Sequence, residues 1–442
     1  MKEIKDIYIF TLGCPKNEVD SQIMAKCLTD NGWTIRNSIE ESQIIIINTC
    51  GFIEEAKGES LDIIWQALDH KEKGQIQHVI VTGCLAERYG ALLAEEIPEL
   101  DAIIGNRNIR RMPEFLASAI SSEKKPYIQL HKEFDSNWYE EPIASPNANW
   151  SYIKVAEGCN NRCSYCSIPG IRGDLRSIPM ESIIKQANHT IENGAKEIIV
   201  VAQDTTAYGM ENGQSKFADL IYRLTDIQGD FWIRVLYAHP KHLSDENIKA
   251  LAQSPKVVPY LDLPIQHISD KMLSMMSRKV SSGQIRERIE KIKEKIPNVT
   301  LRTSVIVGFP GETDKDFDEL AEYIGEGHFV RGGVFSYSQE EGTSAADLPE
   351  QVSTRIIQKR KQIMDYLFED LRHKRNKSLE GNNLPALIEN RGTRPELYWG
   401  RTIHDAPQID CMVRIKGEAR VGDIMDINII RGSENHLLGI VK

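Results

Sequence analysis

Short apolar runs alternate with amphipathic stretches along the first 120 residues of the chain. Each run has the length of a buried strand, and the stretch after it carries apolar residues at helical spacing. The runs are DIYIFT (6–11), QIIIINT (43–49) and HVIVTG (78–83), and the helix-like stretches are 18–31, 54–71 and 87–96. This alternation predicts a parallel sheet with helices between its strands.

The same alternation resumes near residue 150 and continues through six apolar runs. The runs are SYIKVA (151–156), EIIVVA (197–202), WIRVLY (232–237), VPYLDL (258–263), TLRTSVIVG (300–308) and GVFSYS (333–338). Six βα repeats in succession predict an α/β barrel or a partial (β/α)6 barrel. The segment 354–379 follows with apolar residues at helical spacing, so we expect a helix docked on this domain.

Two other segments lack the βα pattern. Residues 121–149 are rich in proline, serine and charge, which indicates a linker. After Gly381 short strand-like runs alternate with turn residues, which predicts a small β-barrel. We therefore expect an N-terminal α/β domain at 1–120, a linker at 121–149, the barrel domain at 150–375 and the C-terminal β-barrel at 376–442.

The composition, with 41% hydrophobic and 27% charged residues, is that of an ordinary folded protein. The net charge of −10 disfavours sequence-independent binding of naked nucleic acid, because that mode needs clustered lysine and arginine. From residue 376 onward the chain carries nine basic and nine acidic side chains, and a neutral tail is a poor phosphate clamp. A protein target suits this tail better.

The amino-terminal residues MKEIKDIYIF carry charges where a signal peptide would be apolar. No apolar run approaches the length of about 18 residues that a membrane-spanning helix needs. We therefore expect a cytoplasmic protein with no membrane partner. A reducing compartment argues against disulfides among the eight cysteines, so metal or redox chemistry is the better interpretation.

The stretch EGCNNRCSYCSIPGIRG (157–173) places Cys159, Cys163 and Cys166 within eight residues, directly after a predicted strand. Thiolates crowded on a loop bind soft metals, so iron–sulfur clusters and zinc are the candidates. A structural zinc site needs four ligands, and no further His or Cys lies nearby in the sequence. The incomplete set indicates a cluster with one iron left open.

A second group of thiols is spread over the N-terminal domain. Cys14, Cys50 and Cys84 each follow the carboxyl end of a predicted parallel strand, where ligand sites of open α/β sheets assemble. The alternative is three buried, small apolar residues, which is how we interpret Cys27 and Cys411. Asp20 lies near the first of these thiols. We interpret it as a residue at the start of a helix, where the helix dipole favours acidic side chains.

Four motifs carry a resemblance that covers essentially the whole chain. They are TLGCPKNEVDS, NTCGFIEEAKGES, VTGCLAERY and EGCNNRCSYCSIPGIRGDLRS. With the β-rich tail, of the kind called TRAM, the chain resembles the methylthiotransferase family of radical SAM enzymes. The resemblance implies two 4Fe-4S clusters, an auxiliary one on Cys14, Cys50 and Cys84 and a radical SAM one on Cys159, Cys163 and Cys166. It also implies that S-adenosylmethionine occupies the open iron of the latter.

Two branches of this family differ in substrate. One modifies an adenosine in tRNA, and the other modifies the β-carbon of an aspartate in the twelfth protein of the small ribosomal subunit. The segments YAHP, YLDLPIQHISD, FSYSQEEGTSAADLP and GRTIHDAPQIDCMVRI resemble the ribosomal branch, and the tRNA branch has a QSGS-type segment where this chain has QHIS. Two alternatives stay open, a tRNA methylthiotransferase and a zinc-stabilised RNA-binding protein without catalysis.

An unactivated C–H bond has no acidity that a side-chain base can use, so the resemblance implies radical abstraction of hydrogen. No catalytic side chain and no electron donor are assigned. Strand ends of the barrel offer candidate contacts to S-adenosylmethionine. The alternative for each of these residues is a role in making a turn or capping a helix. The candidates are Tyr165, Gln203, Asp204, Thr205 and Gly308. His239 and His267 also lie at strand ends. Each is either a structural residue or a group that faces the substrate.

Overall fold

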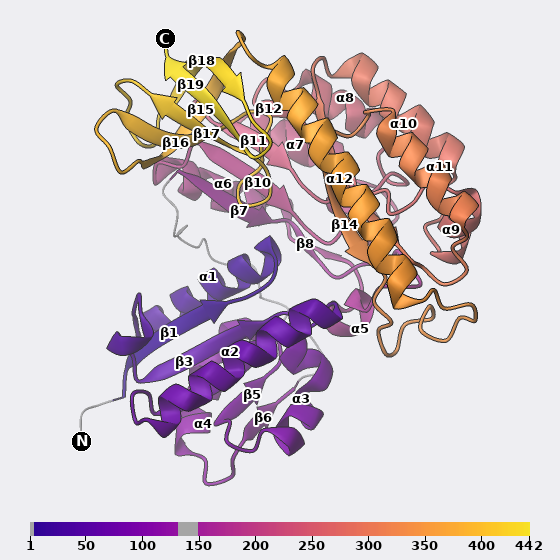
Figure 1. Ribbon diagram of the computed structural model, residues 1–442. Coiled ribbons are helices and arrows are strands. Elements are labelled where there is room, and N and C mark those ends of the chain that lie inside the picture. Colours follow the sequence, from indigo (N-terminus) through magenta and orange to yellow (C-terminus); the bar gives the residue numbers. More distant parts are fainter. Residues whose placement is uncertain (1–3, 131–148) are drawn as a thin grey trace. The chain divides into compact units, whose positions relative to one another are not determined.

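The computed structural model describes residues 4–130 and 149–442 (Figure 1). The chain divides into two compact units. The first comprises the described residues of Met1–Pro146 together with Glu157–Asn160 and Cys166–Asp174, and the second comprises those of Asn147–Ala156, Asn161–Tyr165 and Leu175–Lys442. No helix in these described ranges is both long and apolar enough to cross a membrane.

The first unit is built on a six-stranded parallel sheet in the order β2-β1-β3-β4-β5-β6 (Figure 1). Its strands are β1 (Asp6–Thr11), β2 (Thr34–Ile35), β3 (Ile44–Thr49), β4 (His78–Gly83), β5 (Ala102–Ile104) and β6 (Tyr127–Gln129). Its α-helices are α1 (Pro15–Asp30), α2 (Glu54–Glu72), α3 (Cys84–Glu96), α4 (Met112–Ser121) and the short α5 (Ile168–Arg172).

The apolar runs of the sequence form the buried centre of this sheet. All six residues of β3 are buried, because helices pack on both faces of a parallel sheet. Ile45, Ile47, Val79 and Val81 from β3 and β4 belong to one hydrophobic core. The three predicted strands are confirmed.

The range 121–149, predicted as a linker, contains a strand that the sequence pattern did not reveal. The three residues of β6 pair in parallel with β5 and extend the sheet to residue 129. So short an edge strand has no apolar periodicity to detect. The remainder of the predicted linker, at 131–148, lies outside the described residues.

The second unit contains another six-stranded parallel sheet, in the order β14-β13-β12-β11-β10-β7. Its strands are β7 (Trp150–Lys154), β10 (Glu197–Val201), β11 (Trp232–Val235), β12 (Val257–Asp262), β13 (Thr300–Val307) and β14 (Arg331–Ser336), and the short β8 (Ala156–Glu157) and β9 (Arg176–Ser177) pair separately. Its α-helices are α6 (Met180–Glu192), α7 (Phe217–Thr225), α8 (Asp245–Gln253), α9 (Asp270–Met275), α10 (Ser282–Lys295), α11 (Asp314–Gly325) and α12 (Thr354–Ser378). The predicted partial barrel is confirmed, because β7 and β14 form its two edges.

The helix predicted to dock on the barrel domain is α12, which covers one side of β14 (Figure 1). Phe368 of α12 occupies the space beside Gly332, where a Cβ would lie 2.2 Å from the Phe368 ring. The glycine therefore lets helix and strand approach closely.

The C-terminal strands close into the predicted small barrel, in the order β15-β16-β17-β19-β18. They are β15 (Asn383–Arg391), β16 (Leu397–Thr402), β17 (Met412–Lys416), β18 (Ile424–Gly432) and β19 (His436–Val441). Alternate residues of these strands point inward and form a core of their own, which includes Ile388, Val413, Ile415 and Ile427.

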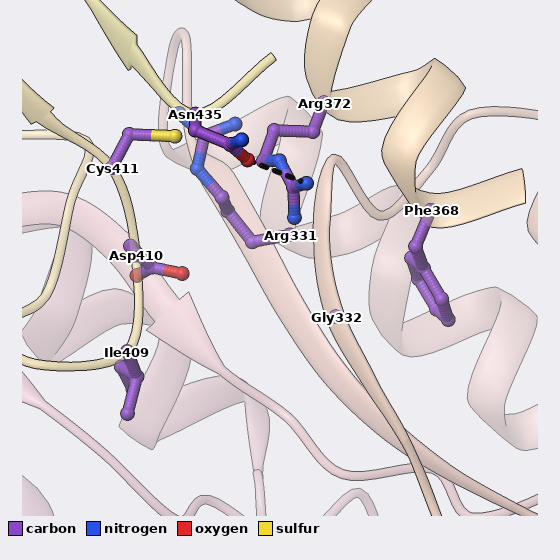
Figure 2. Close-up of a pocket in the computed structure, with 8 residues that line it drawn as sticks. All are labelled: Arg331, Gly332, Phe368, Arg372, Ile409, Asp410, Cys411 and Asn435. Atoms are coloured by element: carbon purple, nitrogen blue, oxygen red, sulfur yellow. Dashed lines mark hydrogen bonds between the residues drawn. The ribbon is translucent and has the colours of Figure 1, made fainter. Parts of the chain in front are cut away.

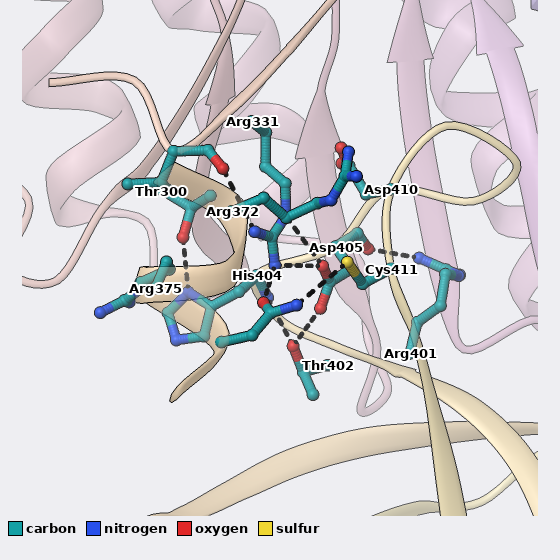
Figure 3. A network of polar contacts seen from close by, with 12 residues as sticks. Thr300, Arg331, Arg372, Arg375, Arg401, Thr402, His404, Asp405, Asp410 and Cys411 are labelled. Carbon is teal, nitrogen blue, oxygen red and sulfur yellow. Dashed lines mark hydrogen bonds and ion pairs between the residues drawn. The ribbon is translucent and has the colours of Figure 1, made fainter. Parts of the chain in front are cut away.

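Buried polar contacts attach this barrel to the amino ends of the parallel strands (Figure 3). Arg331, the first residue of β14, pairs with Asp405 at 2.9 Å from Nη2 to Oδ1. Thr300 and His404 share a hydrogen bond of 2.9 Å between Oγ1 and Nδ1. Burial lowers the pKa of His404 to about 4, so the imidazole is neutral at physiological pH. The β-barrel is therefore attached at the amino end of the sheet.

Candidate functional site

Cys14, Cys50 and Cys84 meet at the carboxyl edge of the N-terminal sheet. They follow β1, β3 and β4, which are neighbours in the sheet, so the strand order brings together thiols that are far apart in sequence. Burial, with smaller contributions from the nearby Cys84 and Cys14, raises the pKa of the Cys50 thiol to about 12. The pKa of Cys84 is raised for the same reason.

A glycine adjoins each of these three cysteines. Gly13 has a φ of +91° and Gly83 a φ of +94°, a conformation that other residues adopt only with strain. A Cβ on Gly83 would lie 2.4 Å from the carbonyl oxygen of Thr49, and one on Gly13 would lie 2.9 Å from Cβ of Cys50. The glycines thus permit the close approach of strand ends that gathers the thiols.

The spacing of the three thiols distinguishes between kinds of metal centre. Among the described residues, the group of ligand atoms that all lie within 4.8 Å of one another is Asp204, His239 and His242, not the cysteines. A single zinc ion with Zn–S bonds of about 2.3 Å would require sulfurs about 4 Å apart. The three thiols, as they stand, are not spaced for a single zinc ion.

A buried arginine lies against the same thiols. Arg172 is 3% exposed, and its Nη2 lies 3.4 Å from Sγ of Cys84. Its Nη1 pairs with Asp20 at 2.9 Å and with Glu157 at 3.0 Å, two carboxylates that are almost fully buried. These negative groups keep the pKa of Arg172 well above its ordinary value. The guanidinium is therefore a permanent positive charge beside the sulfur ligands.

Sequence reasoning missed Arg172, although it lies in the same stretch as the three clustered cysteines. It also interpreted Asp20 as a helix-starting acid, which the structure corrects. Asp20 is the sixth residue of α1, beyond the first turn where the helix dipole acts, and it is buried in an ion pair. The sequence did contain a signal for Arg172, because it is a basic residue in a glycine-rich loop that also carries three cysteines.

The loop with Cys159, Cys163 and Cys166 is held by local contacts. The N–H of Cys159 donates to the carbonyl of Gly173 at 3.1 Å. Nη1 of the buried Arg278 donates to Sγ of Cys163 at 3.6 Å. All three thiols are partly exposed, so the loop presents them rather than burying them in a core.

Asp204, at the end of β10, ties this loop to the barrel. Its carboxylate is 2% exposed and accepts hydrogen bonds from Asn161, His242, Thr206 and the N–H of Ala207. The donors lower the pKa of Asp204 well below its ordinary value. With four donors its lone pairs are used, so Asp204 acts as a support for Asn161 and the cysteine loop.

The same contacts argue against a metal ion on Asp204, His239 and His242. Nδ1 of His239 accepts the N–H of Lys241 at 3.1 Å, so its proton is on Nε2 and that nitrogen has no free lone pair. Burial lowers the pKa of His239 well below its ordinary value, and the ring is neutral. Asp204 and His242 form a hydrogen-bonded pair, whereas Nε2 of His239 is buried and has no hydrogen-bond partner among the described residues.

The other predicted cofactor contacts differ in accessibility. Thr205 is fully buried, and its hydroxyl donates to the carbonyl of Leu236 at 2.6 Å, so it serves the turn after β10. Gln203 and Tyr165 are partly exposed. The Tyr165 hydroxyl lies 3.5 Å from Nη1 of Arg278. Gln203 and Tyr165 therefore have surface to offer a ligand.

His267 is a structural residue. Its ring is fully buried, Nε2 donates to Glu312 at 3.2 Å, and Nδ1 accepts the N–H of Ser269 at 3.0 Å. Glu312 is itself paired with Arg360 at 2.6 Å. Because both ring nitrogens have protein partners, His267 has none left for a substrate.

Gly308 is required by its own backbone and by α12. Its φ is +78°, and a Cβ there would lie 2.3 Å from Cγ1 of Ile357. Its N–H donates to Glu312 at 2.7 Å. The side of the glycine that a side chain would fill is therefore occupied by Ile357.

We expect Gly308→Ala to lower the stability of the protein by about 1–3 kcal/mol, through left-handed backbone strain and the clash with Ile357. Thermal unfolding of the two proteins measures the difference. The double variant Gly308→Ala, Ile357→Ala should lose less stability than the sum of the losses of the two single variants, because removing the Ile357 side chain relieves the clash. A loss larger than that sum would contradict this explanation.

A cavity of about 220 Å³ lies at the opposite, amino end of β14 (Figure 2). It is lined by Arg331, Gly332, Phe368, Arg372, Ile409, Asp410, Cys411 and Asn435. Arg372 donates to Asn435 at 3.1 Å. Burial raises the pKa of the Cys411 thiol, which accepts a hydrogen bond from Asn376. A neutral, buried thiol suits a packing residue, and this cavity belongs to the domain junction.

Three family models match the chain. The model described as Radical SAM superfamily matches residues 153–324, Uncharacterized protein family UPF0004 matches residues 6–105, and TRAM domain matches residues 381–441. Each match falls on one of the three sheet or barrel structures.

Curated relatives match almost from end to end. The ribosomal protein uS12 methylthiotransferase RimO of Desulforamulus reducens is 41% identical over 437 residues, which is 98% of each chain. The protein of that name from Geobacter sulfurreducens is 42% identical over 440 residues, again 98% of each chain.

Solved structures with a similar fold are radical SAM enzymes. The methyltransferase TsrM from Kitasatospora setae, with cobalamin and a [4Fe-4S] cluster bound, has a TM-score of 0.54 at 12% identity, over 76% of this chain and 75% of that one. The cobalamin-dependent enzyme OxsB has a TM-score of 0.54 at 12% identity, over 83% of this chain and 56% of that one. At such identity the likeness shows the fold alone, and it confirms the predicted fold class.

Proposed function

The chain belongs to the RimO family of radical SAM methylthiotransferases, and on that premise we propose that it transfers a methylthio group to the β-carbon of an aspartate in ribosomal protein uS12. The observation that carries the proposal is the identity of about 40% to curated RimO proteins over nearly the whole chain. The family predicted from the sequence motifs is confirmed by these relatives.

As a radical SAM enzyme the chain uses S-adenosylmethionine and an iron–sulfur cluster. We propose that it holds two 4Fe-4S clusters, the radical SAM one on Cys159, Cys163 and Cys166 and an auxiliary one on Cys14, Cys50 and Cys84. When bound, these groups supply the radical that takes hydrogen from the aspartate and the methylthio unit that replaces it. The convergence of the N-terminal thiols, too widely spaced for one zinc ion, supports the second cluster.

The protein's own residues hold this chemistry in place. Arg172 supplies positive charge next to the auxiliary thiols, where thiolates and a cluster carry negative charge. Asp204 anchors Asn161, two residues after Cys159. For S-adenosylmethionine we propose direct contacts from Tyr165 and Gln203, while Asp204, Thr205 and Gly308 shape the surrounding turns.

We propose four functional parts: the auxiliary-cluster domain at 1–120, a linker within 121–149 whose residues 127–129 extend the first sheet as β6, the radical SAM domain at 150–375 and the TRAM domain at 376–442. The partner is the ribosomal protein of the small subunit, encountered in the cytoplasm. The electron donor is not assigned.

A strain without this gene tests the proposed function. We expect uS12 from that strain to lack a mass increment corresponding to one methylthio group, while its tRNA nucleosides keep all of theirs. Mass spectrometry of the ribosomal peptides and of the digested tRNA measures both. Loss of a methylthio nucleoside with unchanged uS12 would replace the proposal by a tRNA activity.

A metal analysis separates the enzyme from a zinc-stabilised RNA-binding protein. Protein purified without oxygen should contain about eight iron and eight sulfide per chain, as two 4Fe-4S clusters require. One or two zinc ions and no sulfide would exclude the radical mechanism.

A further inference from the structure

A charged row crosses the face of the barrel sheet that is turned away from α12. In parallel strands, residues that pair across the ladder point to the same face. Asp262 of β12 pairs with Arg302 of β13, and Arg302 pairs with Arg331 of β14. Phe368 of α12 lies against Gly332, the neighbour of Arg331, so the charged row is on the opposite face.

The Arg302 guanidinium is only partly satisfied by the protein. Its Nη1 donates to Oδ1 of Asp262 at 2.9 Å. Among the described residues its Nε, which is buried, makes no hydrogen bond and lies 3.8 Å from Oδ1 of Asp410. No hydrogen bond of Nη2 is found there either. Donor groups buried without acceptors cost free energy, so the site favours a ligand that supplies an oxygen.

Next to Nη2 of Arg302, β14 carries a glycine. This nitrogen lies 3.6 Å from the position a Cβ would have on Gly333, which has no side chain to fill that side. Phe335, two residues further along β14, is 44% exposed and forms an apolar wall, and Ser304 is partly exposed. A small acidic group that reaches this face would meet a cation and an apolar surface.

Asp262 sets the orientation of this guanidinium. Its other carboxylate oxygen, Oδ2, accepts the N–H of Tyr237 at 3.0 Å, so the acid is fixed between β11 and β13. This ion pair engages Nη1, and Nε faces Asp410, so Nη2 is the nitrogen left to donate to a ligand.

We infer that Arg302 binds the side-chain carboxylate of the substrate aspartate. The inference rests on the proposed function and deepens it, because it assigns the residue that selects an acidic substrate. The carboxylate is attached to the carbon that loses hydrogen, so holding it fixes which C–H bond is presented. A neutral adenine base would give this guanidinium no charged partner.

A purely structural role for Arg302, as an attachment for the TRAM domain, accounts for less of the geometry. Asp410, the TRAM residue near it, accepts from the Tyr260 hydroxyl at 2.6 Å and from the N–H of Ala406 at 2.9 Å through Oδ2. Its Oδ1 lies 3.8 Å from Nε of Arg302, an ion pair that is too long for a hydrogen bond. Asp410→Asn removes that ion pair and leaves Arg302 in place, so the variant separates attachment to the TRAM domain from binding of a substrate.

The test uses the full-length holoenzyme and small ribosomal subunits from a strain without the gene, carrying uS12 with either aspartate or asparagine at the modified position. The variants are Arg302→Gln, Arg302→Lys and, as a matched control, Asp410→Asn. Methylthio-uS12 and 5′-deoxyadenosine are measured together, with iron content and melting temperature for each variant.

We expect the wild-type enzyme to prefer aspartate over asparagine by about 100-fold or more in kcat/KM, because a site built for a charged group rejects its neutral analogue. Arg302→Gln should bring the two substrates within about 10-fold, mainly by raising KM for aspartate. Arg302→Lys should keep the charge and part of the preference, and Asp410→Asn should keep all of it. Cleavage of S-adenosylmethionine without ribosomes should continue in Asp410→Asn, and the same assay on the Arg302 variants reports whether their cofactor site is intact.

A preference that survives Arg302→Gln intact in a protein of normal iron content overturns the inference. So does a result in which Asp410→Asn and Arg302→Gln change the melting temperature and the preference alike, since that pattern belongs to a structural residue. If Arg302→Gln does not fold, a preference in Arg302→Lys equal to that of the wild type overturns it. A wild-type enzyme that modifies neither substrate overturns the proposed function instead.

Discussion

Replacing any one of Cys14, Cys50 or Cys84 by alanine is expected to remove about half of the bound iron and to abolish methylthio transfer. The protein should fall from about eight to about four iron per chain, because a 4Fe-4S cluster that has lost one of three protein thiolates is poorly held. Cleavage of S-adenosylmethionine should persist, since the thiols for that reaction are on a different loop. Iron analysis and product assays under anaerobic conditions measure both effects.

Two further variants make this result specific. Cys27→Ala alters a cysteine on α1, away from the strand ends, and should leave iron content and activity unchanged. Cys163→Ala should also lose about four iron but should stop cleavage of S-adenosylmethionine as well. If each of the three single variants Cys14→Ala, Cys50→Ala and Cys84→Ala kept its full iron content, the auxiliary cluster would be refuted.

Arg172→Gln is expected to destabilise the protein by about 3–5 kcal/mol, the usual cost of removing one partner from a buried ion pair. The change leaves the carboxylates of Asp20 and Glu157 buried without a cation. It also removes a positive charge beside Cys84, so the reduction potential of the auxiliary cluster should become more negative. Thermal unfolding and redox titration of the anaerobic protein measure the two effects.

The matched control is Arg223→Gln. Arg223 pairs with Glu181 on the surface, where the side chains are 47% and 77% exposed, and exposed pairs contribute at most about 1 kcal/mol. A second variant, Arg172→Gln with Asp20→Asn, should recover part of the lost stability by removing one uncompensated charge. Equal effects of Arg172→Gln and Arg223→Gln would contradict the role of the buried cluster of charges.

Much of the fold was predictable because it depends on local pattern. The strands of both sheets are runs of apolar residues such as IIIINT and EIIVV, whose length and flanking turns indicate buried strands. The exceptions are the short β2, β5 and β6 of the first sheet, which were not predicted. The three residues of β6, for example, form a strand only because β5 offers an edge to pair with. The order of cysteines after strands also predicted where their thiols would gather.

The contacts around the site were not predictable in the same way, because their partners are far apart in sequence. Arg172 meets Asp20 and Cys84 across 152 and 88 residues. Ile357, from α12, explains the glycine at 308, which the sequence alone had suggested for the approach of a cofactor. Such partners depend on packing and strand register, which no local pattern records.

The sequence by itself determined the order of the main strands and helices, since periodicity is a property of neighbouring residues. Its motifs carried the resemblance to the family, which implied the six cysteines proposed as cluster ligands. Only the tertiary structure decided which charges surround these cysteines. It showed that Asp204 has its lone pairs occupied, and that Nε of Arg302 makes no hydrogen bond among the described residues. Those features arise from strand register and burial, which bring side chains together only when the chain has folded.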